Sequence, residues 1–182
     1  YDKMCFTVSS AGGRRGAQMG TFDVGHPDVM EFIRAKREAG RRRQFNLSLL
    51  VTDEFMQAVV DDGPWHLRAV KDGSIIKTVQ ARDLMRQISQ ATWECADPGM
   101  QFDTTINKWH TAHNTGRING SNPCSEYMHL DNSACNLASL NLLKFLNDDD
   151  SFDGEGFKAS VAVIFTAQEI LVDNSSYPTK AI

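Results

Sequence analysis

The sequence lacks any apolar run that approaches the roughly 18 residues of a membrane-spanning helix. No basic segment followed by an apolar one opens the chain, so the pattern of a secretory signal is also absent. Neither sign of charge dominates, because 23 acidic and 19 basic residues leave a net charge of −4. We therefore expect a soluble cytoplasmic protein with no membrane partner, and overall charge gives no argument for nucleic-acid binding.

Cysteine pairs of the CxxC type are missing as well. The four cysteines are Cys5, Cys95, Cys124 and Cys135. Their spacing is poor for zinc, and in an unsecreted chain reduced thiols are favoured over a disulfide scaffold. His110, His113 and His129 do not have the spacing of metal ligands either. We expect no bound metal ion.

The 182 residues amount to about one domain, and 41% of them are hydrophobic, which is enough for a sizeable core. The chain starts with Tyr1, directly in an apolar periodic segment, and stops on a turn at "SSYPTKAI". We interpret it as a piece of a longer polypeptide.

Periodicity predicts strands alternating with helices, which indicates an α/β fold. We expect helices near Met4 to Val8, over residues 28–40, from Thr52 and Asp53 through Val59, over residues 82–96, and over residues 157–173. A strand covers residues 45–49, and a hairpin with its turn at Asp72 and Gly73 joins residues 65–70 to residues 74–79. The helix over residues 82–96 should bury Leu84, Met85, Ile88 and Trp93, and a later buried segment should contain Cys135, Leu137, Leu140 and Leu142.

"SNPCSEY", residues 121–127, is the first stretch that could carry chemistry. In an extended segment, Asn122, Cys124 and Glu126 would share one face, about 6 to 7 Å apart between neighbours. A carboxylate beside a thiol keeps the thiol protonated, which argues against a thiolate nucleophile and favours hydrogen-atom chemistry. A turn with an incidental cysteine is an equally good interpretation. Cys135, considered alone, is best read as a small core residue.

"SAGGRRGAQMG", residues 10–20, is rich in glycine but lacks the ending of a phosphate-binding P-loop and is not a GxGxxG motif. Flexible backbone and two guanidinium groups suit contact with a nucleotide base or phosphate, and a mobile basic surface loop is an equal alternative. "RAKREAGRRR", residues 34–43, has no aromatic residue and is interrupted by acidic charge. A solvated helix end is therefore favoured over a nucleic-acid site.

Two stretches taken together, "SNPCSEYMHLDNSACNLASLNL" and "GGRRGAQMGTFDVGHPDVMEFI", resemble the catalytic subunit of ribonucleotide reductases, and most closely the vitamin B12-dependent class II enzymes. The resemblance extends over nearly the whole chain. It implies a ten-stranded α/β barrel of which residues 1–182 are the central part, with no second domain. It also implies a finger loop over about residues 119–130, with Cys124 at its tip, and a specificity loop over about residues 9–20.

The resemblance assigns a role to each residue of the first stretch. Cys124 would carry the thiyl radical that removes the 3′ hydrogen of a ribonucleotide. Glu126 would take the proton of the 3′-hydroxyl group, and Asn122 would hydrogen-bond the ribose. Cys135 would be one of two reducing thiols, whose partner lies upstream of this region at a position that Cys5 does not match.

The specificity loop, by the same resemblance, would lie between an effector nucleotide and the substrate base. Its residues are Gly12, Gly13, Arg14, Arg15, Gly16, Ala17 and Gln18, with Arg15 as the expected contact to the base or phosphate. The resemblance also implies adenosylcobalamin as cofactor, ribonucleoside diphosphates as substrates, and a thioredoxin-type reductant for the full-length enzyme. The alternatives are a class I reductase that depends on a metal-generated radical, and a nucleotide-binding module without chemistry.

Overall fold

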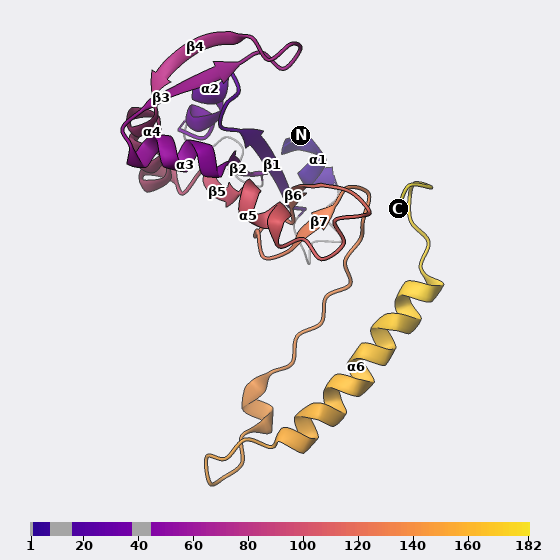
Figure 1. Cartoon of the computed structure of the whole chain (residues 1–182). Coiled ribbons are helices and arrows are strands. Elements are labelled where there is room, and N and C mark those ends of the chain that lie inside the picture. Colours follow the sequence, from indigo (N-terminus) through magenta and orange to yellow (C-terminus); the bar gives the residue numbers. More distant parts are fainter. Residues whose placement is uncertain (1, 8–15, 38–44) are drawn as a thin grey trace. The chain divides into compact units, whose positions relative to one another are not determined.

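The computed structural model of the chain describes residues 2–7, 16–37 and 45–182. The chain divides into two compact units, Tyr1–Asp131 and Asn132–Ile182. Figure 1 shows the elements of both units. The first contains α1 (Asp2–Thr7), β1 (Gln18–Asp23), α2 (Val29–Arg34), β2 (Phe45–Val51), α3 (Asp53–Val60), β3 (Pro64–Arg68), β4 (Ile75–Gln80), α4 (Ala81–Cys95), β5 (Gly99–Phe102), α5 (Asp103–Lys108), β6 (Ile118–Ser121) and β7 (Met128–Leu130). The second contains the 3-10 helix η1 (Leu142–Phe145) and α6 (Gly154–Asn174).

A parallel sheet with the strand order β1-β2-β5 organises the first unit. The central strand β2 buries Leu47, Leu49 and Val51 on one face, while Ser48 on the opposite face is also only 3% exposed. A strand that is covered on both faces is typical of a parallel sheet in an α/β protein. Leu49 and Val51 belong to a core that draws on α2, α3, α4 and β3; its buried members are Val24, Val29, Ile33, Leu49, Val51, Phe55, Leu67, Ala81, Leu84, Ile88 and Ala91.

Most elements predicted from periodicity are confirmed. The helix that starts at Asp53 is α3, and the Thr52 hydroxyl group caps it by accepting a hydrogen bond from the backbone N–H of Phe55 at 3.3 Å. The expected hairpin is formed by β3 and β4, and Gly73 in its turn has a φ of +72°. The helix expected over residues 28–40 is shorter than predicted, because α2 ends at Arg34.

Helix α4 corrects one residue of the predicted core. Leu84 and Ile88 are buried and Met85 packs partly against the core, as expected. Trp93 is 83% exposed, so its predicted burial is wrong. It follows Leu84 by nine residues, about two and a half helical turns, and therefore lies on the opposite side of the helix. Ala91, which is fully buried, takes the place expected for Trp93.

Four short strands, β1, β5, β6 and β7, were not predicted. Three of them lie in the segment over residues 97–130, which is rich in polar and turn-forming residues. Strands β1 and β5 pair with β2, which is far from them in the sequence, so tertiary contacts outweigh weak local strand propensity. Strands β6 and β7 pair with each other as a hairpin, and their polar, turn-rich sequence gives little strand signal. The α/β class is confirmed, and the described residues form an open three-stranded parallel sheet instead of a closed barrel.

The second unit has no buried residue. Cys135, Leu137 and Leu142 are exposed and Leu140 is half-buried, so the prediction of a buried segment is wrong for this unit. Residues 133–141 have no regular structure, and the aromatic contacts that hold the unit together lie further on, between Phe145, Phe152 and Phe157. Helix α6 covers the predicted helix over residues 157–173 and exposes Val163, Phe165 and Ile170. Helices with apolar residues on more than one side are usually surrounded by other elements of the protein.

Candidate active site

One face of the parallel sheet is polar. Side chains alternate between the two faces of a strand, and residues paired across parallel strands share a face. The register pairs Thr21 with Ser48, and Leu50 with Gln101. The face opposite the helical core therefore carries the polar side chains of Thr21, Asn46, Ser48 and Gln101, together with Met19 and Leu50.

The antiparallel hairpin of β6 and β7, residues 118–130, lies over this polar face, and we call it the Cys124 hairpin. Each strand of the sheet supplies a hydrogen bond to it. Thr21 on β1 donates to the Asn119 carbonyl oxygen at 3.1 Å, and Asn46 on β2 donates from Nδ2 to the Pro123 carbonyl oxygen at 2.5 Å. Gln101 on β5 donates from Nε2 to the Ser121 hydroxyl group at 2.8 Å. The sheet thus holds the segment that contains Cys124.

The base of the hairpin is fixed by α5. The Asn107 side chain accepts a hydrogen bond from the backbone N–H of Ile118 at 3.0 Å and donates one to the Ile118 carbonyl oxygen at 3.1 Å. Arg117 forms an ion pair with Asp103, which is only 8% exposed. Ile118 itself is 5% exposed, so the hairpin starts from a well-anchored residue.

Residues 122–125 form a tight turn at the tip of the hairpin, and we call it the Cys124 turn. The backbone N–H of Ser125 donates to the Asn122 carbonyl oxygen at 3.0 Å, and Ser125 has a φ of +63°. The prediction that Asn122, Cys124 and Glu126 share one face of an extended segment is therefore wrong. Pro123, with its fixed φ, suits the second position of such a turn. Cys124 and Glu126 are both exposed, so the turn presents the thiol and the carboxyl group outward.

Asn122 has a structural function in the turn. Its Oδ1 accepts a hydrogen bond from the backbone N–H of Tyr127 at 3.0 Å, and its own N–H donates to the Tyr127 carbonyl oxygen at 3.2 Å. These two hydrogen bonds join the two ends of the segment over residues 122–127.

The predicted specificity loop is described only in part. Gly12, Gly13, Arg14 and Arg15 lie outside the described residues. A Cβ atom at Gly16 would collide with the backbone of Cys5, which explains a glycine there, and Ala17 is exposed. Gln18 is the first residue of β1, so regular structure begins inside the range expected for the loop.

A comparison with protein families matches residues 1–182 to the model described as "Ribonucleotide reductase, barrel domain". The chain belongs to the ribonucleotide reductase family. It is 46% identical to the vitamin B12-dependent ribonucleotide reductase of Streptomyces clavuligerus, over 100% of this chain and 22% of that protein. It is 42% identical to the enzyme of the same name from Rhodopirellula baltica, over 100% of this chain and 20% of that protein.

A vitamin B12-dependent ribonucleoside-diphosphate reductase from Mycobacterium tuberculosis strain H37Rv is 39% identical, over 98% of this chain and 25% of that protein. The chain thus spans a fifth to a quarter of the length of these reductases. The resemblance to the ribonucleotide reductase family inferred from the two sequence stretches is confirmed.

Cys135, which the family resemblance predicts to be one of two reducing thiols, lies in the second unit. Its thiol is exposed and donates a weak hydrogen bond to the Asn136 carbonyl oxygen at 3.6 Å. Nearby, Gln168 on α6 donates to the same carbonyl oxygen at 3.2 Å. The segment that contains Cys135 is therefore tied to α6 through the backbone of the next residue.

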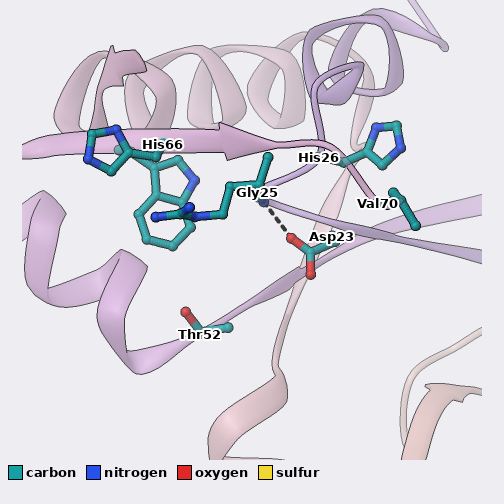
Figure 2. A pocket seen from close by; sticks show the side chains of 8 residues that line it. Asp23, Gly25, His26, Thr52, His66 and Val70 are labelled. Carbon is teal, nitrogen blue, oxygen red and sulfur yellow. Dashed lines mark hydrogen bonds between the residues drawn. The ribbon is translucent and has the colours of Figure 1, made fainter. Parts of the chain in front are cut away.

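The chain also has a hollow of about 540 Å³ at the carboxyl ends of β1 and β2, within the size range of small-ligand sites. It is lined by Asp23, Gly25, His26, Thr52, Trp65, His66, Arg68 and Val70. Figure 2 shows His66 and His26 on opposite sides, with Asp23 between them and hydrogen-bonded to the backbone of Gly25 at 2.5 Å. Sequence reasoning did not single out these residues, because they come from separate segments that only folding brings together.

In the part of the chain that the structure describes, no cluster of three or more His, Cys, Asp or Glu side chains could hold a metal ion. No helix there is both long enough and apolar enough to cross a membrane.

Proposed function

We propose that this chain is the part of a vitamin B12-dependent ribonucleoside-diphosphate reductase that bears the radical thiol, Cys124. The observation that supports the proposal most directly is the exposed Cys124 at the tip of a hairpin that is hydrogen-bonded to the polar face of a parallel sheet. The family match and the names of the relatives support the reaction and its class.

The reaction replaces the 2′-hydroxyl group of a ribonucleotide by hydrogen. Cys124, as a thiyl radical, takes the 3′ hydrogen atom of the ribose and returns a hydrogen atom to that carbon at the end. The 2′-hydroxyl group leaves as water. Two thiols supply the two electrons and the two protons that this loss requires, and they become a disulfide. Cys135 is one of these thiols in our proposal, and its partner is a cysteine outside residues 1–182.

Glu126 and Asn122 act on the same ribose in this proposal. Glu126 takes the proton of the 3′-hydroxyl group while the hydrogen atom moves to Cys124, and its exposed position close to the turn is compatible with that role. Asn122 donates from Nδ2 to a ribose oxygen, because its Oδ1 already accepts from Tyr127.

The architecture proposed for the reductase includes the ten-stranded barrel, and residues 1–182 would be the central part of that barrel domain, with no second domain within them. The polar face of the β1-β2-β5 sheet would then face the interior of the barrel, and the Cys124 hairpin would be the finger loop. The apolar surface of α6 supports this, because it requires neighbouring elements to cover it. The specificity loop, residues 9–20, would respond to an effector nucleotide through Gly12, Gly13, Arg14, Arg15, Gly16, Ala17 and Gln18.

The cofactor proposed is adenosylcobalamin, on the strength of the names of the relatives. When bound, it supplies the one-electron chemistry that removes the hydrogen atom from a thiol. Cys124 fits that chemistry because its side chain is exposed and forms no disulfide. The proposed partners of the enzyme are a ribonucleotide substrate, an effector nucleotide and a thioredoxin-type reductant.

The test uses the protein expressed from its complete reading frame. Cys124→Ser should abolish formation of deoxynucleotides and leave nucleotide binding intact. The matched control is Cys95→Ser, since the Cys95 thiol on α4 donates to the backbone carbonyl oxygens of Ala91 and Asp97 and a hydroxyl group can do the same. Deoxynucleotide formation by the Cys124→Ser protein would refute the assignment of the radical thiol. Nucleotide binding without any deoxynucleotide formation by the unchanged protein would favour a nucleotide-binding module without chemistry.

A further inference from the structure

Gln101 is a buried polar residue of the sheet that contacts the Cys124 turn. It lies on β5, on the polar face of the sheet, and is only 3% exposed. A buried amide in a strand is costly unless it forms hydrogen bonds. Among the described residues, the hydrogen bonds of the Gln101 side chain lead to the Cys124 turn and its immediate flank.

The side-chain amide of Gln101 holds both ends of the turn. Its Nε2 donates to the hydroxyl group of Ser121 at 2.8 Å and to that of Ser125 at 3.2 Å. Ser121 is the last residue of β6, and Ser125 directly follows Cys124. One buried nitrogen therefore connects the segment before the thiol with the segment after it.

The two serines also contact each other. Their hydroxyl oxygens lie 3.3 Å apart, and the Ser121 hydroxyl group donates to the Asn122 carbonyl oxygen at 2.9 Å. Ser125 needs this support because its φ of +63° is unfavourable for a residue with a side chain. The network thus fixes the backbone on both sides of Cys124.

The oxygen of the same amide, Oε1, is buried and has no partner among the described residues. An unsatisfied buried carbonyl oxygen destabilises a fold, so stability alone would favour an apolar side chain of the same shape at this position. The presence of an amide at position 101 is therefore explained by the hydrogen bonds that its nitrogen donates to Ser121 and Ser125.

We propose that Gln101 is a positioning residue for Cys124, and that it fixes the direction of the thiol by bracing Ser121 and Ser125. The inference rests on the proposed function, because it assumes that the direction of the Cys124 thiol limits turnover. A misplacement of about 1 Å in a reacting group can lower a rate by about 100-fold. Loss of the two hydrogen bonds from Gln101 would allow the four-residue Cys124 turn to shift by a distance of that order.

Gln101→Met tests the proposal in the protein expressed from its complete reading frame. Methionine has a similar shape and no polar group, so it removes the brace and the unsatisfied oxygen together. We expect kcat for ribonucleotide reduction to fall about 10- to 100-fold, with KM for the nucleotide and the melting temperature unchanged. Gln90→Met is the matched control, because Gln90 is exposed on α4 and its side chain donates to Glu94 on the same helix, away from the Cys124 turn. A kcat equal to that of the control would overturn the proposal.

Alkylation of Cys124 supplies a readout that does not depend on turnover. The rate of its reaction with iodoacetamide, followed by mass spectrometry of the peptide that contains it, should change in Gln101→Met and stay constant in Gln90→Met. The rate for exposed Cys135 serves as an internal reference. If Cys124→Ser proved active, the proposed function would fail while a changed alkylation rate would still support the brace. An unchanged rate would contradict the brace.

The serines give a second route if Gln101→Met does not fold. Ser121→Ala combined with Ser125→Ala removes the acceptors and leaves Gln101 in place. We expect the same loss of kcat and the same change in alkylation as for Gln101→Met, and no further loss when all three changes are combined. Full activity of the double serine variant would overturn the proposal, and so would losses that simply multiply in the combined variant.

Discussion

Asn46 on β2 donates a hydrogen bond of 2.5 Å from its side-chain amide to the carbonyl oxygen of Pro123, the residue before Cys124. The two residues are 77 positions apart in the sequence. The central strand of the sheet thus holds the backbone of the proposed radical site directly, and Asn46 is a polar side chain on a strand whose opposite face is core.

Asn46→Asp should lower turnover by about 10- to 100-fold. The change keeps the size of the side chain but replaces the donor with a carboxylate, which repels the Pro123 carbonyl oxygen. Turnover of the protein expressed from its complete reading frame is the measurement. Asn147→Asp, in an exposed turn where Asn147 bonds to Ser151, is the control and should be fully active. Equal activity of both variants would show that the Asn46 bond does not position the turn.

Helix α4 allows a test of its observed orientation. Ile88→Ala should lower the free energy of unfolding by about 2 to 5 kcal/mol, because it leaves a cavity in the core. Trp93→Ala should change it by no more than about 0.5 kcal/mol, since Trp93 is 83% exposed. Urea denaturation measures both. A larger loss for Trp93→Ala than for Ile88→Ala would mean that the opposite face of the helix is the buried one.

The cap of α3 should contribute measurably to stability. Thr52→Ala removes the acceptor for the backbone N–H of Phe55 and should cost about 1 kcal/mol. Thr105→Ala, inside α5 with its side chain exposed, should be neutral or slightly stabilising because alanine is the better helix former. Thermal unfolding of the two variants and of the unchanged protein measures both effects. Equal stability of Thr52→Ala and the unchanged protein would contradict the stabilising effect of the cap.

The hairpin of β3 and β4 should lose stability in acid. The backbone N–H and the hydroxyl group of Ser74 donate to Asp72 and hold the pKa of its carboxyl group below the ordinary value. A lowered pKa in the folded state means that the contribution is present above the ordinary aspartate range and is lost as the pH falls through the folded pKa. An NMR titration of Asp72 should therefore have its midpoint below that of an unfolded peptide with the same sequence. A midpoint at or above the peptide value would contradict the hydrogen bonds.

Local patterns were sufficient for the elements whose stability is local. The hairpin turn at Asp72 and Gly73, the cap at Thr52 and the apolar stripe of α4 all depend on residues within a few positions of one another. Trp93 shows the limit of such reasoning, because its hydrophobicity suggested burial while its angular position on the helix excluded it. The strands β1 and β5 were missed because their distant partner β2, not their own residues, makes them strands.

By itself, the sequence determined the α/β class, the membership in the ribonucleotide reductase family and the choice of Cys124 as the residue of interest. A short motif and periodic hydrophobicity are properties of neighbouring residues, so they can be recognised without coordinates. Only the tertiary structure decided that "NPCSE" is a turn and that Asn46 and Gln101 hold it. Hydrogen bonds between residues that are 20 or 77 positions apart depend on how the sheet is assembled, and no local pattern encodes them.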